Sequence, residues 1–350
     1  MRFAKPAQPA RSARIRAVEL DRERVLALLR RHGFNTTSFQ ALEDGLAYWW
    51  DSGGACVAYA DTPRAWVAAG APIAEPEALA GVAERFVEAA RARGKRASFF
   101  ATQDRLARLP GMRSVPVGLQ PVWDPRTWAE PARSSRSFRG QLARARNKGV
   151  VVRRARADEL RDPTSSTRRA AEALVERWLG ARRMAPMGFL VSVQPFSFAE
   201  ERRVYLAERD GCVVGCLSAV PVYARNGWFL EDLLRDRDAP NGTMELLVDA
   251  AMHGAAQEGC PWATLGLAPL SGPVPPWMRG VGALARPLYD FAGVRAFKAK
   301  FAPAGWEPVY VTHPRDVRTP VAVLDALRAF AGENLLGFAL RTMTETYASV

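Results

Sequence analysis

Residues 227–259, GWFLEDLLRDRDAPNGTMELLVDAAMHGAAQEG, contain the pattern that decides the fold. The first eight are rich in aromatic and branched side chains, which is typical of a buried strand. Residues 243–259 are typical of a helix that ends at a glycine. Charged side chains crowd the turn between them. The segment therefore predicts a strand that leads directly into a helix, with acidic and basic groups at the junction.

The same order of elements occurs twice along the chain. The first occurrence has three short strands within residues 47–70, a helix at 76–94, and strands at 95–102 and 117–124. The second has strands at 204–209, 212–224 and 227–234, a helix at 243–259, a strand at 262–268, a helix at about 284–300 and a strand at 307–313. Two copies of one plan predict an α+β protein with two lobes, each a mostly antiparallel sheet flanked by helices.

The boundary between the lobes is predicted near residues 124–135, which are rich in proline, serine and charge. The predicted divisions are a basic N-terminal tail at 1–19, a first lobe at 20–130, a second, catalytic lobe at 131–318 with a basic linker segment at 133–156, and a C-terminal helix at 319–350. We expect the apolar stripe of that last helix to pack onto the second lobe, with a membrane surface as the alternative.

Composition and charge limit the class of partner. The chain has 350 residues, 48% of them hydrophobic and 24% charged, as in globular proteins. Its net charge of +13 favours a polyanionic partner, either nucleic acid or an anionic membrane surface. The four cysteines form no CxxC pair, and no stretch has the apolar length of a membrane span. These features predict a cytoplasmic location, with the inner face of the membrane as a peripheral site.

A run of basic residues follows the predicted boundary. Residues 136–156 contain eight arginines and lysines and no acid. The first part is expected to form a helix at 136–147, on which Arg136, Arg139 and Arg146 share one face while Arg144 points elsewhere. The alternative, a solvated helix face, normally includes interleaved acids. The candidates for contact with the phosphates of a polyanion are Arg136, Arg139, Arg144, Arg146 and Lys148.

Most familiar catalytic motifs are absent. The chain has three histidines and no GxSxG, HExxH, Walker A or GxGxxG motif, so we expect neither a metal nor a bound cofactor. Strands that feed a helix suggest the architecture of the GNAT acyltransferases. Residues 237–244, however, lack the Q/R-x-x-G-x-G/A loop with which that family binds coenzyme A. The helix N-terminus remains able to hold an anion.

Three segments together resemble the catalytic domain of the aminoacyl-phosphatidylglycerol synthases, also called phosphatidylglycerol lysyltransferases. They are EDLLRDRDAPNGTMELL at 231–247, LGLAPLSG at 265–272 and LYDFAGVRAFKAKFAPAGWEPVYV at 288–311. The likeness extends over roughly residues 20–330. It implies two tandem GNAT-like lobes that take an amino acid from aminoacyl-tRNA and pass it to a lipid hydroxyl. The residues before Met187 lack the acid that the family pattern has there.

The resemblance also implies catalytic residues. An aminoacyl-tRNA is an activated ester, so its transfer requires no nucleotide, metal or covalent nucleophile. Asp232 and Arg235 match the functional Asp-x-x-Arg pair of the family, and both are expected to face one groove. Asp232 is assigned to the acceptor proton or to the free ammonium of the amino acid, and Arg235 to the terminal adenosine, its phosphate or the oxyanion. The alternative is an Asp–Arg pair that only stabilises a turn.

Further residues are predicted to bind substrate. Glu231 is a possible second acid, but regular strand geometry would place it on the opposite face from Asp232. Asn241 is expected first as a helix N-cap and second as a ligand contact. The predicted substrate-binding set is Glu231, Asn241, Gly242, Ser271, Gly272, Lys298 and Lys300. The two lysines are too close in sequence to share one helix face, so only one is expected to point inward.

The leading hypothesis is therefore an aminoacyltransferase that moves an amino acid from aminoacyl-tRNA to phosphatidylglycerol or another membrane lipid. A soluble small molecule or peptide is the alternative acceptor within the same class. A coenzyme A-dependent N-acyltransferase is a second alternative. The third is a module without catalysis that binds RNA or a membrane.

Overall fold

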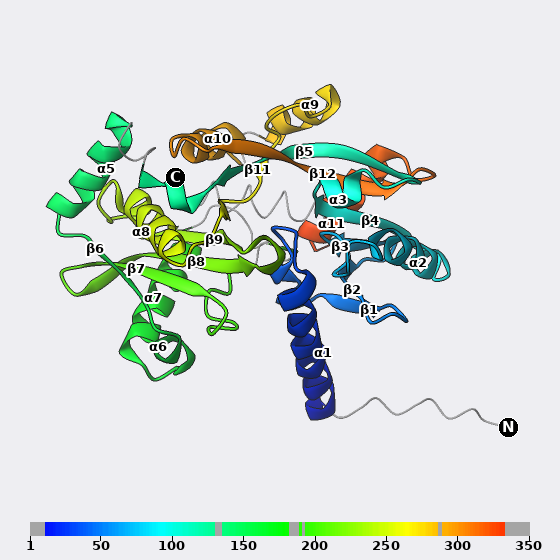
Figure 1. The fold of residues 1–350 in the computed structure, drawn as a ribbon, viewed down its shortest axis with the longest axis horizontal. Helices are drawn as coiled ribbons and strands as arrows, with labels where there is room; N and C mark the ends of the chain where they lie inside the picture. The colour runs from blue at the N-terminus through cyan, green and yellow to red at the C-terminus, as the bar shows by residue number, and fades with distance from the viewer. Residues whose placement is uncertain (1–10, 130–134, 182–188, 191–192, 286–288, 333–350) are drawn as a thin grey trace.

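The computed structural model describes residues 11–129, 135–181, 189–190, 193–285 and 289–332 (Figure 1). The strands are β1 Ala47–Trp50, β2 Cys56–Asp61, β3 Ala65–Ala69, β4 Arg96–Thr102, β5 Met112–Trp123, β6 Val151–Arg154, β7 Arg203–Arg209, β8 Cys212–Val222, β9 Gly227–Arg235, β10 Trp262–Thr264, β11 Ala268–Pro269 and β12 Gly305–Pro314. The helices are α1 Arg11–His32, α2 Leu79–Arg91, α3 Asp104–Ala107, α5 Arg136–Asn147, α6 Ala157–Arg161, α7 Ser166–Gly180, α8 Thr243–Gln257, α9 Pro276–Ala285, α10 Phe291–Ala299 and α11 Thr319–Phe330.

The two predicted copies of one plan are confirmed. In the N-terminal copy, β1, β2 and β3 form an antiparallel meander, and α2 leads to β4, which is parallel to β3. In the C-terminal copy, β7, β8 and β9 form the meander, and α8 leads to β10, which is parallel to β9. The fold is thus α+β with a mostly antiparallel sheet and tandem GNAT-like copies, as the sequence predicted.

The two copies share one sheet of 12 strands in the described residues, because they exchange strands. The order is β1-β2-β3-β4-β12-β5-β10-β9-β8-β7-β6, and β11 pairs with β5. Strand β5 pairs with β10 of the C-terminal copy, while β12, from the end of the chain, lies between β4 and β5. Figure 1 shows these two long strands bridging the halves. The predicted division at residue 130 stays a prediction.

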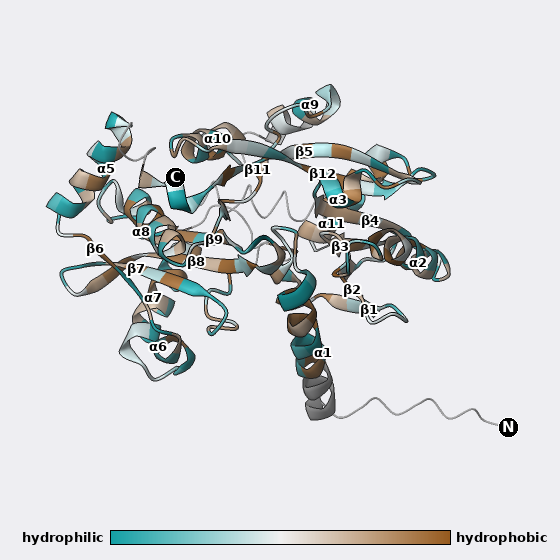
Figure 2. Cartoon of the chain, in the orientation of Figure 1, coloured by the Kyte–Doolittle hydropathy of each residue, from teal (hydrophilic) through white to brown (hydrophobic). Residues whose placement is uncertain are grey.

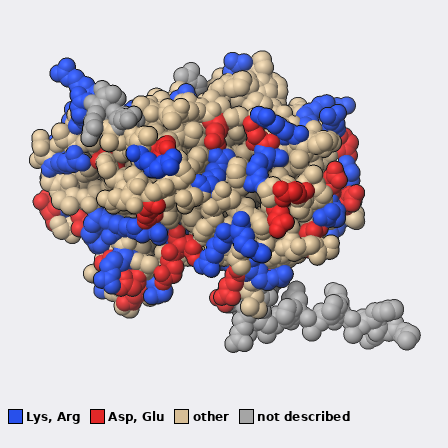
Figure 3. Space-filling view, in the orientation of Figure 1, with Lys and Arg blue, Asp and Glu red and all other residues tan. Residues whose placement is uncertain are grey.

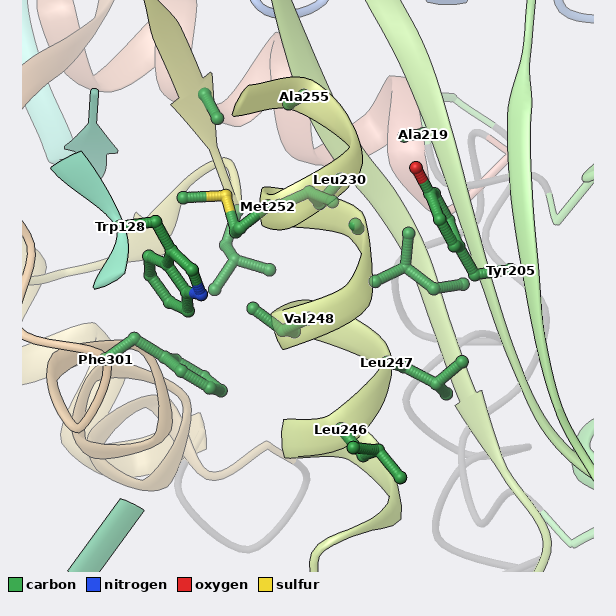
Figure 4. Close-up of a cluster of buried hydrophobic side chains, with 14 of the residues drawn as sticks. Trp128, Tyr205, Ala219, Leu230, Leu246, Leu247, Val248, Met252, Ala255 and Phe301 are labelled. Carbon is green, nitrogen blue, oxygen red and sulfur yellow. The ribbon is translucent and has the colours of Figure 1, made fainter. Parts of the chain in front are cut away.

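Each copy has its own apolar core beneath its crossover helix. Helix α8 lies between two layers: Leu247 and Tyr205 are on its sheet side, and Trp128 and Phe301 are on its other side (Figure 4). In the N-terminal copy, the rings of Tyr59, Trp66 and Phe99 surround Phe86 at centroid distances of 5.5–5.6 Å. Edge-on and tilted packing at such distances stabilises aromatic clusters. These cores fix both crossover helices on the sheet.

One prediction about the C-terminal part is wrong, and a second is met only in part. The helix expected at about 284–300 is two helices, α9 and α10, because the side chain of Asp290 accepts a hydrogen bond from the Gly293 N–H and starts a new helix. Helix α11 packs on β3 and β4 of the predicted first lobe and on β12 of the predicted second lobe. Its buried face consists of small residues, among them Ala322 and Ala326, which permit close contact with the sheet.

The N-terminal helix α1 reaches into the segment predicted as a basic tail. It begins at Arg11, so part of the predicted tail is helical. Its C-terminal half packs into the core through Val25 and Leu29, while the other half projects from the body (Figure 1). Over the ranges described, no helix combines the length and the apolar character needed to cross a bilayer.

Candidate active site

Strands β9 and β10 diverge after a short parallel pairing. Three residue pairs join them, from Trp262–Gly227 to Thr264–Phe229. Strand β9 then continues to Arg235. The segment that follows β10 turns away at Gly266. This residue has a φ of +71°, and a Cβ there would lie 2.6 Å from the Phe229 ring. Pairing resumes only in β11, on β5. The sheet is therefore open beside the last six residues of β9.

Lys298, from α10, contacts the chain at this opening. Its amine donates hydrogen bonds to the carbonyl oxygens of Gly266, at 2.9 Å, and Leu267, at 2.7 Å. Burial lowers the pKa of Lys298 to about 7. These two hydrogen bonds use two N–H groups of the amine and leave one tetrahedral position on the nitrogen. That position carries a proton at a pH below the pKa and a lone pair at a pH above it. The side chain is thus the inward-pointing member of the lysine pair.

A cavity of about 380 Å³ lies at the N-terminus of α8. Its lining residues are Gln141, Arg235, Asn241, Gly242, Met244, Glu245, Phe297 and Lys300. The structure thereby brings together four of the residues that the sequence singled out. Arg235 donates to the Asn241 side-chain oxygen at 3.5 Å, the long end for a hydrogen bond, and Lys300 forms an ion pair with Glu245. Cationic groups and a helix N-terminus make this cavity suited to an anion.

The expectation that Asn241 is the N-cap of α8 is wrong. Gly242 occupies that position, with a φ of +96°, and no side chain caps the helix. A Cβ on Gly242 would lie 2.0 Å from the carbonyl oxygen of Gln141 in α5. The glycine is required because the backbones of α5 and α8 meet here. Asn241 is consequently available to Arg235 and the cavity.

The structure does not bring Asp232 and Arg235 to one groove. Gly215, the cross-strand partner of Arg235, faces α8, since its Cβ would contact Leu247 at 3.1 Å. Leu234 packs instead in the core under α7. Side chains alternate along a strand, so Asp232 shares the α7 face with Leu234. The expectation that both residues face one groove is therefore wrong. Their catalytic roles stay predictions.

Glu231 lies on the same face as Asp232, contrary to expectation. The register between β8 and β9 shifts between Ser218 and Ala219, which leaves Glu231 as the extra residue of a bulge. Its carboxylate pairs at 2.6 Å with Arg202, which also donates to the Ser218 hydroxyl at 3.0 Å. Ser218 is the cross-strand partner of Asp232. Three charged groups therefore gather on the α7 face beside the opening.

Arg202 was not identified from the sequence. Its side chain is 4% exposed and that of Glu231 is 8% exposed, so each neutralises a charge that would otherwise be costly to bury. The guanidinium also donates to the Ser197 carbonyl at 2.8 Å. The sequence EERRVY contains two arginines, and nothing in it indicates that the first is buried. Only the fold distinguishes it from Arg203.

Ser271 and Gly272 contact the sheet. The Ser271 hydroxyl donates to the Ala268 carbonyl at 2.7 Å and accepts from the Leu119 N–H at 3.1 Å. Gly272 has a φ of +78°, and a Cβ there would lie 2.7 Å from the Leu119 side chain. Both residues hold the turn after β11 against β5. Substrate contact by either one stays a prediction.

The basic helix α5 has the predicted bounds and presents its cations to solvent. Phe138, Leu142 and Ala145 form its buried stripe. The five predicted phosphate contacts, Arg136, Arg139, Arg144, Arg146 and Lys148, are all exposed. Figure 2 shows the alternation of hydrophilic and hydrophobic residues along α5, and Figure 3 shows basic side chains at that end of the molecule.

Two of these arginines have partners in the described structure. Arg144 donates to the side chain of Gln141, which lines the cavity, at 3.4 Å. Arg146 forms an ion pair with Asp249 at 3.3 Å, and Asp249 also accepts from Trp128. The side of α5 that carries Arg144 therefore adjoins the cavity, and the basic surface of the helix continues into it.

Comparison with known proteins identifies relatives of this arrangement. The family model described as phosphatidylglycerol lysyltransferase, C-terminal, matches residues 26–313. A phosphatidylglycerol lysyltransferase from Bacillus subtilis is 26% identical over 312 residues, which is 85% of this chain and 35% of that protein. This chain therefore spans about a third of the length of that relative.

Solved structures share the fold. The C-terminal domain of a candidate lysylphosphatidylglycerol synthetase from Agrobacterium fabrum is 22% identical, with a TM-score of 0.75 over 91% of this chain and 99% of that one. The L-PGS structure from Bacillus licheniformis is 20% identical, with a TM-score of 0.72 over 88% of this chain and 96% of that one. At these identities the likeness establishes the fold.

Proposed function

The chain belongs to the phosphatidylglycerol lysyltransferase C-terminal family, and from that premise we propose that it transfers an amino acid from aminoacyl-tRNA to the hydroxyl of phosphatidylglycerol. One observation carries the proposal most directly. A cavity with cationic groups at the N-terminus of α8 adjoins both an exposed basic helix and the opening between β9 and β10. An aminoacyl-tRNA is a polyanion with a reactive 3′ end, and it matches this arrangement of basic helix, cavity and opening.

The donor would bind on the α8 face. Exposed cations of α5 contact the phosphates of the acceptor stem, an interaction that gives affinity without sequence readout. The terminal adenosine enters the cavity, where Arg235 and Lys300 meet its phosphate or ribose oxygens. The positive end of α8 adds to their attraction. Asn241, close to Arg235, orients the guanidinium.

The reaction would take place at the opening in the sheet. The acceptor hydroxyl oxygen attacks the ester carbonyl carbon, and the bond from that carbon to the ribose oxygen of tRNA breaks. Asp232 takes the acceptor proton, which finally passes to the departing ribose oxygen. Lys298, held by two carbonyl oxygens at the opening, in its protonated form donates a hydrogen bond from its third N–H to the developing oxyanion and keeps that proton. The buried pair of Glu231 and Arg202 fixes the strand that carries Asp232.

The test is transfer of a labelled amino acid. The purified chain is incubated with a pool of radiolabelled aminoacyl-tRNAs and phosphatidylglycerol vesicles, and label is followed into the lipid extract. We expect transfer that Arg235→Ala reduces strongly and that Arg237→Ala, two positions away and exposed, leaves unchanged. Retention of all label on tRNA, with and without lipid, would contradict the proposal. Label in a water-soluble product would redirect it to a soluble acceptor.

A further inference from the structure

The segment around α9 has an unusual charge pattern. Between Glu258 and Asp290 the sequence contains no acid, and its only charged residues are Arg279 and Arg286. Elsewhere the chain carries 36 acids, so a run of this length without one marks a distinct surface. Helix α9 occupies the middle of this segment.

One side of α9 is anchored in the molecule. Met278 is 6% exposed and packs in a core cluster with Val115 and Val311. Leu267 and Leu270, which precede the helix, border the same cluster. Leu267 is also a residue whose carbonyl accepts a hydrogen bond from Lys298. An apolar strip thus connects α9 with the opening between β9 and β10.

The other side of α9 is exposed to solvent. Trp277 is 41% exposed, and Arg279 is exposed on the opposite flank of the buried Met278. Trp277 is the only aromatic residue among the exposed large hydrophobic side chains of the described chain. The remaining exposed positions of the helix whose side chains are described are Pro276, Gly280 and Ala283. A tryptophan and an arginine that flank the solvent-facing side of a helix, with no acid on that helix, are compatible with a helix that lies at a membrane interface.

The position of α9 suits contact with a flat surface. Figure 1 shows the helix standing out from the edge of the molecule, away from α1 and α7. In Figure 3, the corresponding projection is mostly uncharged, with basic atoms at its tip. With 10 residues the helix is too short to cross a bilayer. Such a projection can reach the headgroup layer before the rest of the molecule does.

We propose that α9 docks the protein onto an anionic lipid surface, with Trp277 at the level of the headgroups and Arg279 on lipid phosphates. This inference rests on the proposed function, because an acceptor held in a bilayer must be brought to the opening where Lys298 lies. The strip formed by Met278, Leu270 and Leu267 joins the docked helix to that opening. Anionic lipid is favoured over an apolar protein groove because the exposed face combines a cation with the absence of acids.

The test is flotation of the full chain with vesicles of phosphatidylcholine, with and without phosphatidylglycerol. We expect binding only to the vesicles that contain phosphatidylglycerol. Trp277→Ala should weaken it about tenfold, and Arg279→Gln about fivefold, as expected for one cation near an anionic surface. Leu327→Ala and Leu179→Ala are matched controls, since each removes an apolar side chain that is 43% exposed on another helix. Neither control should change binding.

The same variants separate this inference from the proposed function. Trp277→Ala should lose transfer to vesicle lipid and retain transfer to dispersed short-chain phosphatidylglycerol. Vesicle binding that depends on Trp277, in a protein that transfers no amino acid, would support docking and contradict the function. Flotation of Trp277→Ala equal to that of the unaltered chain would overturn docking. A change in oligomeric state without a change in flotation would also overturn it, in favour of a second copy on this face.

Discussion

The two copies of the fold differ most where their parallel strands meet. In the N-terminal copy, β3 pairs with β4 along its whole length, from Ala65–Arg96 to Ala69–Phe100. The Gly70 N–H then donates to the Phe100 carbonyl and extends the closure. In the C-terminal copy, β10 pairs with only three of the nine residues of β9. One plan therefore yields a closed sheet in one copy and an open one in the other.

The crossover helices of the two copies also differ, at their N-termini. Helix α2 begins after Ala78, which has ordinary helical geometry, and its apolar face is sealed by the ring cluster around Phe86. Helix α8 begins after Gly242 in the left-handed region, where α5 approaches closely and the cavity lies. This difference is the reason why we place the proposed transfer in the C-terminal copy and assign the N-terminal copy to support of the fold.

The largest expected effect is the loss of a cavity cation. Arg235→Ala should lower kcat/KM for aminoacyl transfer about 10²- to 10³-fold, as for other groups that stabilise charge in a transition state. The matched change in the closed copy is Arg85→Ala, which breaks a 2.7 Å pair with the buried Asp51. The guanidinium lowers the pKa of Asp51, so this variant should lose stability and keep its activity below its melting temperature. Equal losses of activity in both variants would contradict the division between the copies.

Gly242→Ala should have the next largest effect. The added Cβ would lie 2.0 Å from the Gln141 carbonyl, so α5 must move away from α8. We expect a loss of about 3 kcal/mol in the free energy of unfolding, typical of forced overpacking. Gly94→Ala in the closed copy, with a φ of +69° and no atom within 4 Å, should cost only about 1 kcal/mol. Denaturant melts of both variants measure the difference, and equal costs would show that backbone strain alone matters.

Lys298→Met should have an effect that depends on pH. The folded pKa of about 7 lies below the usual 10.5, so between these values the unfolded chain binds more protons and the stability from this lysine rises with pH. Below pH 7, the buried cation is protonated in both states and its penalty is fully present. The variant loses two hydrogen bonds at any pH, worth about 1 kcal/mol each. Melting experiments should therefore show a larger loss at pH 9 than at pH 6, and a larger loss at pH 6 would contradict the burial.

The smallest effect is expected on the surface of α5. Arg144→Gln should weaken tRNA binding several-fold and reduce the slope of log K against log salt by about 1. The exposed Arg64 of the closed copy provides the control, and Arg64→Gln should leave both quantities unchanged. Titrations at several salt concentrations give the slope. An unchanged slope for Arg144→Gln would remove α5 from the proposed tRNA contact.

Much of the fold follows from local pattern, whereas its assembly does not. Short runs of aromatic and branched residues predicted the strands of both meanders, and α5 has the bounds predicted for it. The insertion of β12 between β4 and β5 joins residues about 200 positions apart, and no local pattern encodes such a pairing. The helix expected at 284–300 divides because a single aspartate, Asp290, can start a new helix.

The candidate site was predictable in part. Four cavity residues were identified: Arg235 through the family's Asp-x-x-Arg pair, Asn241 and Gly242 through their place at the helix start, and Lys300 within the third segment that resembles the family. The separation of Asp232 from Arg235 follows from regular strand alternation, whereas the face of Glu231 could not be derived, because it is the extra residue of a bulge. Arg202 was missed because its burial depends on Glu231, 29 positions away.

Hydrogen exchange with a bound donor analogue tests the central claim most directly. The ligand is a tRNA acceptor stem that carries its amino acid through a non-hydrolysable amide. The account predicts slower exchange in residues 230–247 and 264–300 of the open copy, and no change in residues 65–102 of the closed copy. Protection of 65–102 without protection of 230–247 would contradict it.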